Sequence, residues 1–325
     1  MKRFLCTLSL LALFAGGQLF AGGAGQADAD TFTPSRNIDW IVSSGAGGGS
    51  DIFTRVITDI IRQENLVNRS FMVANRIDGG GEVSRAQVSQ TTGPAANHTL
   101  LTFNSGDLMP MLENTNRRSS DFRIIAVMAL DKQFLYVTPQ SRFQNFQQII
   151  DAINAGERIV VGGSRGDDVV TFNLMLQENG WSHAQMPYIT HNSSNEAITS
   201  ILGGHVDVVV SKPAASDPFV EAGQLIPILA LANERLPGNL SHVPTLGEFP
   251  PFRNVEFPTW RGVAAPAAMT PAAQAYWSNI MAQVVQTHAW RVGYMERFML
   301  IEAFKPYREA TAFVTEFERE FLANR

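Results

Sequence analysis

Apolar and polar residues alternate along this chain in blocks that predict strands followed by helices. Short apolar runs between glycine-rich or polar turns indicate buried strands, and apolar residues three or four positions apart indicate helices with one face on a sheet. The helix expected at 51–63 has Ser50 or Asp51 as its natural N-cap. In chain order the pattern predicts strands over 38–43, 71–74, 99–103, 134–138, 158–161, 185–188, 206–210, 226–232 and 260–264, and helices over 51–63, 82–90, 146–154, 168–179, 217–222, 271–287 and 310–323.

This order of strand, turn and helix is typical of α/β proteins with mainly parallel sheets. The order restarts near residue 134, and a chain of 325 residues exceeds what one core usually serves, so we expect two lobes. Each lobe has a glycine-rich loop between a strand and a helix, at 45–50 and at 162–166. Ligands gather at the carboxyl ends of parallel strands, where helix N-termini favour anions. The two loops therefore predict an anion-binding cleft between the lobes.

The N-terminus has the pattern of a secretory signal peptide. Lys2 and Arg3 precede the apolar run 4–14, which is too short to span a bilayer, and small residues follow it. We expect cleavage between residues 21 and 29; the alternative is a buried N-terminal helix. The single cysteine, Cys6, lies inside this segment, and the six histidines lack metal-ligand spacing. The exported protein is therefore expected to contain no disulfide, metal or other cofactor.

The formal net charge is -5. An acidic chain lacks the basic face that nonspecific nucleic-acid binding requires, so we expect no nucleic-acid partner. A local anion site remains compatible with this charge, because the field at one site depends on the residues nearest to it.

The first glycine loop resembles a dinucleotide-binding fingerprint only in part. Ser50 stands where a third glycine or alanine is expected, the next strand ends at Asn75 rather than at an acidic residue, and no lysine follows as in a phosphate-binding P-loop. A backbone anion site and a plain structural turn are the remaining interpretations. The anion site would consist of Gly45, Ala46, Gly47, Gly48 and Ser50.

The second glycine loop matches G-x-S-x-G, the nucleophile elbow of α/β-hydrolases, with Ser164 at its centre. Asp207 and either His242 or His288 would complete the chain order of a catalytic triad, so a secreted serine hydrolase is the alternative function. The same loop equally suits a ligand cradle without catalysis.

Residues beside this loop offer further ligand contacts. Arg165 could pair with a ligand carboxylate, or lie exposed at the loop tip. Asp167 and Asp168 begin a helix, where they favour its dipole or meet an ammonium or hydroxyl group of a ligand. Tyr188 opens a segment of amide and hydroxyl side chains that could orient a polar ligand or be solvated.

Several motifs occur in the order found in one known family. They are Ala46–Asp51 (AGGGSD) with Arg55, Asn75–Gly81 (NRIDGGG), Gly163–Gly166 (GSRG), Met186–Tyr188 (MPY), Gly204–Asp207 (GHVD), Val243–Glu248 (VPTLGE) and Trp260–Pro266 (WRGVAAP). In this order the chain resembles the Bug family, the periplasmic solute receptors of tripartite tricarboxylate transporters. The resemblance covers nearly the whole chain after the signal peptide.

The resemblance implies a type II periplasmic-binding-protein fold, or Venus flytrap. Such a receptor is a periplasmic monomer that closes on a small carboxylate and delivers it to membrane permease subunits, with no catalytic residue. The implied lobes are 30–134 with 232–325, and 135–231. The ligand residues it implies, with Tyr188 and Ser211 added, are Gly45, Ala46, Gly47, Gly48, Ser50, Asn104, Ser105, Ser164, Arg165, Gly166, Asp167 and Asp168. The acidic pair departs from the family pattern, which favours an amino acid, a hydroxylated acid or an amide-bearing ligand over a dicarboxylate.

Overall fold

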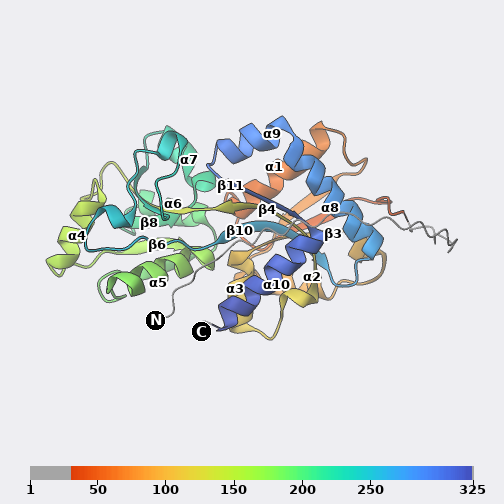
Figure 1. Cartoon of the computed structure of the whole chain (residues 1–325), viewed down its shortest axis with the longest axis horizontal. Helices are drawn as coiled ribbons and strands as arrows, with labels where there is room; N and C mark the ends of the chain where they lie inside the picture. The colour runs from red at the N-terminus through yellow and green to blue at the C-terminus, as the bar shows by residue number, and fades with distance from the viewer. Residues whose placement is uncertain (1–30, 324–325) are drawn as a thin grey trace, which may run out of the picture. The chain divides into compact units, whose positions relative to one another are not determined.

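The computed structural model describes residues 31–323, so the predicted signal peptide and Cys6 lie outside the described residues. The strands form two sheets with helices packed on their faces (Figure 1). The expected two-lobed α/β fold class is confirmed. Between residues 31 and 323, no helix combines the length and apolar character that crossing a bilayer requires.

The first sheet has six strands in the order β11-β4-β10-β3-β1-β2. Strand β1 pairs in parallel with β2 and β3, whereas β10 runs antiparallel to both β3 and β4, and β11 runs antiparallel to β4. The strands of this sheet are β1 Ile38–Val42, β2 Phe71–Asn75, β3 Thr99–Asn104, β4 Phe122–Asp131, β10 Thr259–Pro266 and β11 Ile301–Pro306.

The second sheet has five strands in the order β7-β6-β8-β5-β9. Strand β6 pairs in parallel with β7 and β8, and β5 runs antiparallel to β8 and β9. Both sheets are thus mixed, and the expectation of mainly parallel sheets is wrong, because β5 and β10 enter from the other sheet and not through the helical crossover that parallel neighbours require. The strands of this sheet are β5 Gln133–Val137, β6 Val161–Ser164, β7 Tyr188–His191, β8 Val208–Ser211 and β9 Ile226–Leu231.

Most helices lie where their apolar spacing predicts them. Helix α1 begins at Gly49 with Gly48 as N-cap, earlier than expected, because the Asp51 carboxylate accepts the Gly47 N–H at 2.9 Å and pairs with Arg55 at 3.0 Å. Strands β4 and β11 and helices α3 and α6 have no counterpart among the expected elements. The helices are α1 Gly49–Gln63, α2 Glu82–Ser89, α3 Ser105–Asn114, α4 Phe146–Asn154, α5 Asp167–Asn179, α6 Ser194–Leu202, α7 Pro213–Glu221, α8 Pro271–Gln286, α9 His288–Trp290, the π-helix η6 Arg291–Glu296 and α10 Tyr307–Ala323. The 3-10 turns are η1 Asp78–Gly81, η2 Gly93–His98, η3 Ser119–Asp121, η4 Gly238–Leu240 and η5 Leu246–Glu248.

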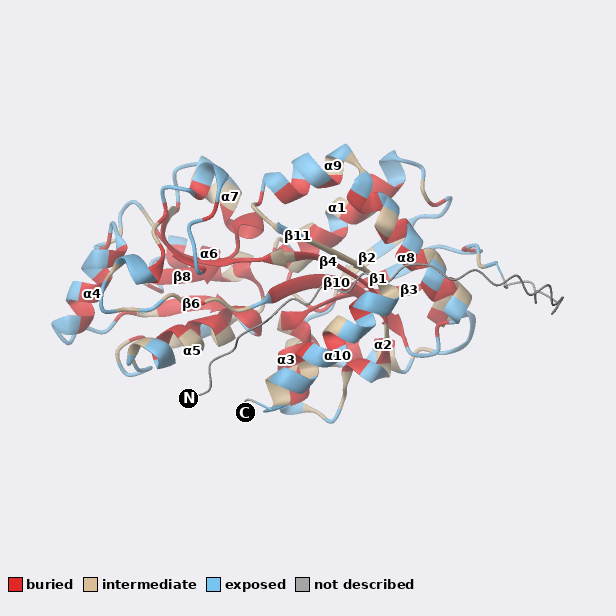
Figure 2. Ribbon diagram, viewed as in Figure 1, coloured by how far each residue is buried: buried red, intermediate tan, exposed pale blue. Residues whose placement is uncertain are grey.

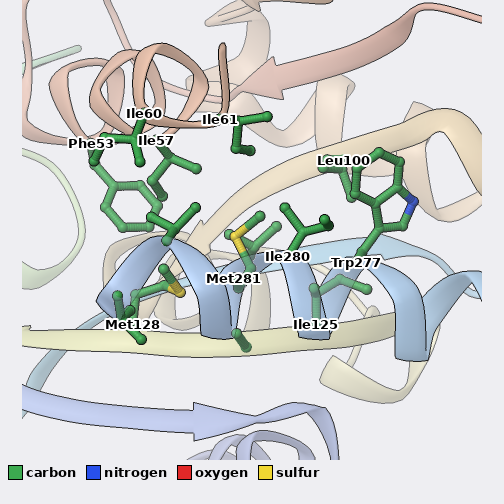
Figure 3. Close-up of a cluster of buried hydrophobic side chains, with 14 of the residues drawn as sticks. Phe53, Ile57, Ile60, Ile61, Leu100, Ile125, Met128, Trp277, Ile280 and Met281 are labelled. Carbon is green, nitrogen blue, oxygen red and sulfur yellow. The ribbon is translucent and has the colours of Figure 1, made fainter. Parts of the chain in front are cut away.

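Helices α1 and α8 cover one face of the first sheet. Figure 3 shows Phe53 and Ile57 of α1 directed toward Met281 of α8 and the strands beneath. Figure 2 shows that the buried residues follow the strands and the inner helix faces, while the outer helix faces are exposed. This packing fixes the start of α1, which borders the site described below.

Two chain segments cross between the sheets, at 131–133 and at 256–259. They are held together by hydrogen bonds and ion pairs: Gln133 Nε2 donates to Thr259 Oγ1 at 2.9 Å, and Lys132 pairs with Glu256. Partial burial alone would raise the pKa of Glu256, but hydrogen bonds from Lys132 and the Asn233 N–H lower it. The paired crossings connect the two sheets.

The return to the first sheet comes later than the expected boundary at 231/232. Leu246 and Val255 belong to a core of the second lobe, and Ala230 bridges to Thr245. We therefore propose that the second lobe extends to the crossing at 256–259. The first boundary, at 134/135, stays a prediction.

A candidate ligand-binding cleft

A polar cleft lies between the two sheets, at the ends of β1, β3, β6 and β8. It encloses about 60 Å³, whereas small-molecule sites usually measure roughly 300–1,000 Å³. The cleft is therefore nearly closed. The lining residues are Ser43, Ser44, Gly48, Gly49, Ser50, Ile77, Gly80, Arg85, Asn104, Gly106, Asp107, Ser164, Arg165, Asp167, Asn192, Ser193, Ser194, Lys212, Thr259, Trp260 and Arg261.

Direct contacts between the lobes account for this closure. The Gly45 N–H donates to the Asn192 carbonyl at 3.2 Å, and Ser105 Oγ donates to Asp167 at 3.2 Å. The backbones of Gly106 and Gly166 also lie close together: a Cβ added to Gly166 would be only 2.7 Å from Gly106 Cα. We expect a ligand to enter when these contacts separate.

The start of α1 presents backbone donors to the cleft. Gly48, its N-cap, has no side chain that could bond the first-turn N–H groups. Such groups at a helix N-terminus carry a partial positive charge and bind anions. Ser50 lies beside them, and its Oγ accepts a hydrogen bond from Asn104 Nδ2 at 2.9 Å.

The first-lobe wall is built around a buried carboxylate. Asn104 and Asp107 form a capping box at the start of α3, with the Asp107 N–H bonded to Asn104 Oδ1 at 3.1 Å. Arg85 donates to Asp107 at 3.1 Å, and Ser43 donates to the same carboxylate. Burial raises the pKa of Asp107, although Arg85 and Ser43 oppose the shift. Arg85 and Asp107 balance each other, so this wall is close to neutral.

The second-lobe wall contains two carboxylates and one lysine. Lys212 Nζ donates to Asp167 at 2.9 Å and also to Asp168, which accepts a further bond from Ser164 Oγ. Burial raises the pKa of Asp168 against the effect of Lys212. Burial would lower the pKa of Lys212, but the two carboxylates outweigh it and raise that pKa. The lysine therefore stays charged and is paired with both carboxylates.

Arg165 differs from the other cations of the cleft. Arg85 pairs with Asp107, Lys212 with the acidic pair, and Arg261 with Asp131 across 2.8 Å. Arg165 is exposed and donates to the neutral Asn192 Oδ1 at 3.1 Å; between residues 31 and 323 it forms no ion pair. Its charge is available to a ligand.

The predicted ligand residues fall into two groups. Those that line the cleft are Gly48, Ser50, Asn104, Ser164, Arg165 and Asp167, while Gly45, Ala46, Gly47, Ser105, Gly166, Asp168, Tyr188 and Ser211 do not. Two residues of the second group are bonded to other parts of the protein. Tyr188 OH donates to the Ser164 carbonyl at 2.8 Å, and the buried Asp168 carboxylate accepts hydrogen bonds from Ser164 and Lys212. Contact of any of these residues with a ligand stays a prediction.

The sequence interpretation missed four charged lining residues, Arg85, Asp107, Lys212 and Arg261. The sequence did contain a signal for Lys212. This residue follows a predicted strand and precedes Pro213, and proline is common in the first turn of a helix. Lys212 therefore lies at the carboxyl end of a strand, where site residues gather. No comparable pattern marks Arg85.

The structure does not assemble the alternative catalytic triad. Ser164 Oγ donates to Asp168, while the Asp207 carboxylate accepts the Val160 N–H at 2.7 Å. His242 and His288 are exposed and are not hydrogen-bond partners of Ser164. Within residues 31–323, no group of three histidine or carboxylate side chains could hold a metal ion.

Comparison with known proteins shows to which family the chain belongs. A family model described as "Tripartite tricarboxylate transporter family receptor" matches residues 54–298. A UPF0065 protein encoded in the gbd 5' region of Cupriavidus necator is 30% identical over 254 residues, which cover 76% of this chain and 74% of the relative. Protein BugT of Bordetella pertussis is 24% identical over 262 residues, covering 77% and 76%.

Among solved structures, MatC of Rhodopseudomonas palustris with bound malate superposes with a TM-score of 0.76 at 16% identity, covering 90% of this chain and 98% of that one. The structural match supports the fold, and the sequence matches identify the family. The chain is a member of the tripartite tricarboxylate transporter receptor family, to which the Bug proteins belong.

Proposed function

We propose that this protein is a periplasmic receptor that binds a small carboxylate in the cleft and delivers it to membrane permease subunits. One observation carries the carboxylate assignment: Arg165 borders the cleft without an ion pair between residues 31 and 323, opposite the uncapped start of α1. The malate bound in MatC supports the ligand class. No catalytic residue enters the proposal.

The ligand carboxylate would lie between Arg165 and the N–H groups of Gly49 and Ser50. Arg165 belongs to the second lobe and α1 to the first, so a ligand held by both favours the closed arrangement. The closed arrangement would be the one that the permease recognises. Receptor action then follows from a shift of population between open and closed lobes.

The second-lobe wall limits what the rest of the ligand can carry. The cluster of Asp167, Asp168 and Lys212 holds two carboxylates and one cation, and Arg165 of the same lobe lies outside this cluster. Asp167 borders the cleft, whereas Asp168 does not. We propose that Asp167 faces a hydroxyl or ammonium group of the ligand, which favours a hydroxylated acid or an amino acid over an unsubstituted dicarboxylate.

A thermal-shift and calorimetric screen tests this function. A ligand at a hundred times its Kd should add about 2.7 kcal/mol of stability, so hydroxy acids, amino acids and dicarboxylates are compared with their neutral amides. Arg165→Met should weaken binding of the best carboxylate roughly ten- to a hundredfold, the usual contribution of a charged hydrogen bond.

Arg158→Met is the matched control, because Arg158 is an exposed arginine of the same lobe outside the cleft. It should leave the affinity unchanged. Equal binding of amides and acids, or equal losses in the two arginine variants, would argue against a carboxylate held by Arg165.

A further inference from the structure

A second, larger cavity lies beside the crossing segments. It measures about 690 Å³, which falls within the usual range for small-molecule sites. Lys132 and Glu256 of the two crossings border it, together with residues 232–238 of the second lobe and the region around α9 and β11 of the first lobe (Figure 1). It shares no lining residue with the cleft.

The interior of the cavity is mainly apolar. Its walls include Met128, Leu236, Trp290, Met295, Met299 and Phe304. Three of these six are methionines, whose flexible side chains adapt to ligands of differing shape. Such a wall suits an alkyl chain or a ring.

The backbone bordering this cavity is unusual. The π-helix η6, Arg291–Glu296, forms part of the wall, and Met299 adopts φ 51°, which is uncommon for a residue with a side chain. Helical segments of this kind occur frequently at functional sites. Their position at the cavity supports a role beyond filling space.

The charged groups at the cavity favour a cation. Lys132 and Glu256 neutralise each other. The exposed side chains of Glu234, Glu296 and Glu302 have no ion pair or hydrogen bond between residues 31 and 323, and Arg291 is the opposing charge without a carboxylate partner in that range. Arg235 is already paired with Glu248. Carboxylates are thus in excess around an apolar interior.

We propose that this cavity is a second ligand site, for a small amphiphilic cation in which an alkyl chain or ring carries an ammonium group. The apolar part lies among the methionines, and the ammonium group lies beside the three unpaired glutamates. Adjacent residues of one crossing serve the two sites: Asp131 pairs with Arg261 at the cleft, and Lys132 borders the cavity. The site does not depend on which molecule occupies the cleft.

The test is calorimetric titration of the protein with octyltrimethylammonium below its micelle concentration. We expect one molecule bound per chain, with octanol and octanoate binding at least fivefold more weakly. Hexyl and butyl analogues should bind progressively more weakly, by about three- to fourfold per methylene group removed. Binding of the cation and the neutral alcohol with equal affinity would overturn the cation assignment.

Two sets of variants locate the site. Ile301→Trp should fill the cavity from its 41% exposed position and abolish binding, whereas Ile189→Trp, at a 44% exposed position on β7, should not. The triple change Glu234→Gln, Glu296→Gln and Glu302→Gln should lower affinity about fivefold or more, because each exposed charge pair contributes about 0.2–1 kcal/mol, or 1.4- to fivefold.

The matched triple control alters glutamates that are exposed and away from the cavity, namely Glu64→Gln, Glu178→Gln and Glu309→Gln. It should bind as the unaltered protein does. Because the altered glutamates are exposed, both triple variants should fold. Undiminished binding to Ile301→Trp, or equal losses in the two triple variants, would overturn the site, as would absence of binding by the unaltered protein.

Discussion

Replacement of Lys212 by methionine is expected to lower the free energy of unfolding by about 3–5 kcal/mol at neutral pH, the usual effect of removing one partner of a buried ion pair. Lys212 is the cation between Asp167 and Asp168, and all three side chains are at least nine-tenths buried. Without it, two adjacent carboxylates would share a site with little solvent. Chemical denaturation measures the loss.

The loss should depend on pH. Burial raises the pKa of Asp168 above its ordinary value of 3.8, so the folded chain binds this proton more tightly than the unfolded chain. Stability from such a group is present at low pH and is lost as the pH rises through the folded pKa. Removing Lys212 raises that pKa further, so the deficit should be smaller at about pH 5 than at about pH 7.

Two further variants identify the cause. Adding Asp168→Asn to Lys212→Met should restore part of the lost stability, because one of the unmatched charges disappears. Lys305→Met, which removes a lysine that lies over the Phe313 ring rather than in an ion pair, should have a smaller effect. A deficit that is independent of pH and is not relieved by Asp168→Asn would contradict the buried charge arrangement.

Gly166→Ala should prevent the lobes from closing as they do here, and weaken ligand binding about tenfold or more, the effect of losing one charged hydrogen bond across the cleft. The added Cβ would lie 2.7 Å from Gly106 Cα and nearer still to its carbonyl oxygen, and backbone atoms cannot move aside as a side chain can. Small-angle X-ray scattering should give a larger radius of gyration for this variant in the presence of ligand. Calorimetry measures the affinity.

Gly180→Ala separates this contact from backbone strain. Gly166 has φ 82° and Gly180 has φ 71°, so alanine is strained at both ends of α5, but no atom lies within 4 Å of a Cβ at Gly180. Gly180→Ala should therefore lower stability without changing affinity or the radius of gyration. Closure and affinity that are unchanged in Gly166→Ala would show that the glycine contact is dispensable.

Elements with one apolar face are predictable from the sequence. The spacing predicts α4 over 146–154, and the helix occupies those residues, because its apolar side chains all face the second-lobe core. Strand β4 escapes prediction for the opposite reason. Its residues Phe122–Asp131 are buried along nearly their whole length, so the sequence shows neither alternation nor helical spacing.

Glycine-rich strand ends are harder to assign. The sequence predicts a strand at 158–161 followed by a loop, but β6 runs over Val161–Ser164. The strand tolerates its glycines because neighbouring side chains lie where a Cβ would stand: Val206 at Gly162, and Tyr188 at Gly163. Such a contact depends on tertiary packing and leaves no trace in the local pattern.

The cleft likewise has parts that local sequence patterns predict and parts that depend on tertiary packing. Its loops are predictable, because a strand end followed by glycines and a helix start is a local pattern, and Gly48, Ser50 and Ser164 lie there. Its charge balance is not predictable, because it rests on pairs such as Asp131 with Arg261, which are 130 residues apart in the chain. Which cation is left free for a ligand is decided only by the folded arrangement.

The paired crossings at 131–133 and 256–259 have a consequence for the entropy of closing. Lys132 with Glu256 and Gln133 with Thr259 keep the two segments side by side, so one lobe cannot translate freely relative to the other. The linked lobes can move relative to each other mainly by rotation. Two unlinked bodies, by contrast, would lose six degrees of freedom on docking. We therefore expect closure around a ligand to cost less entropy than the docking of two separate bodies would.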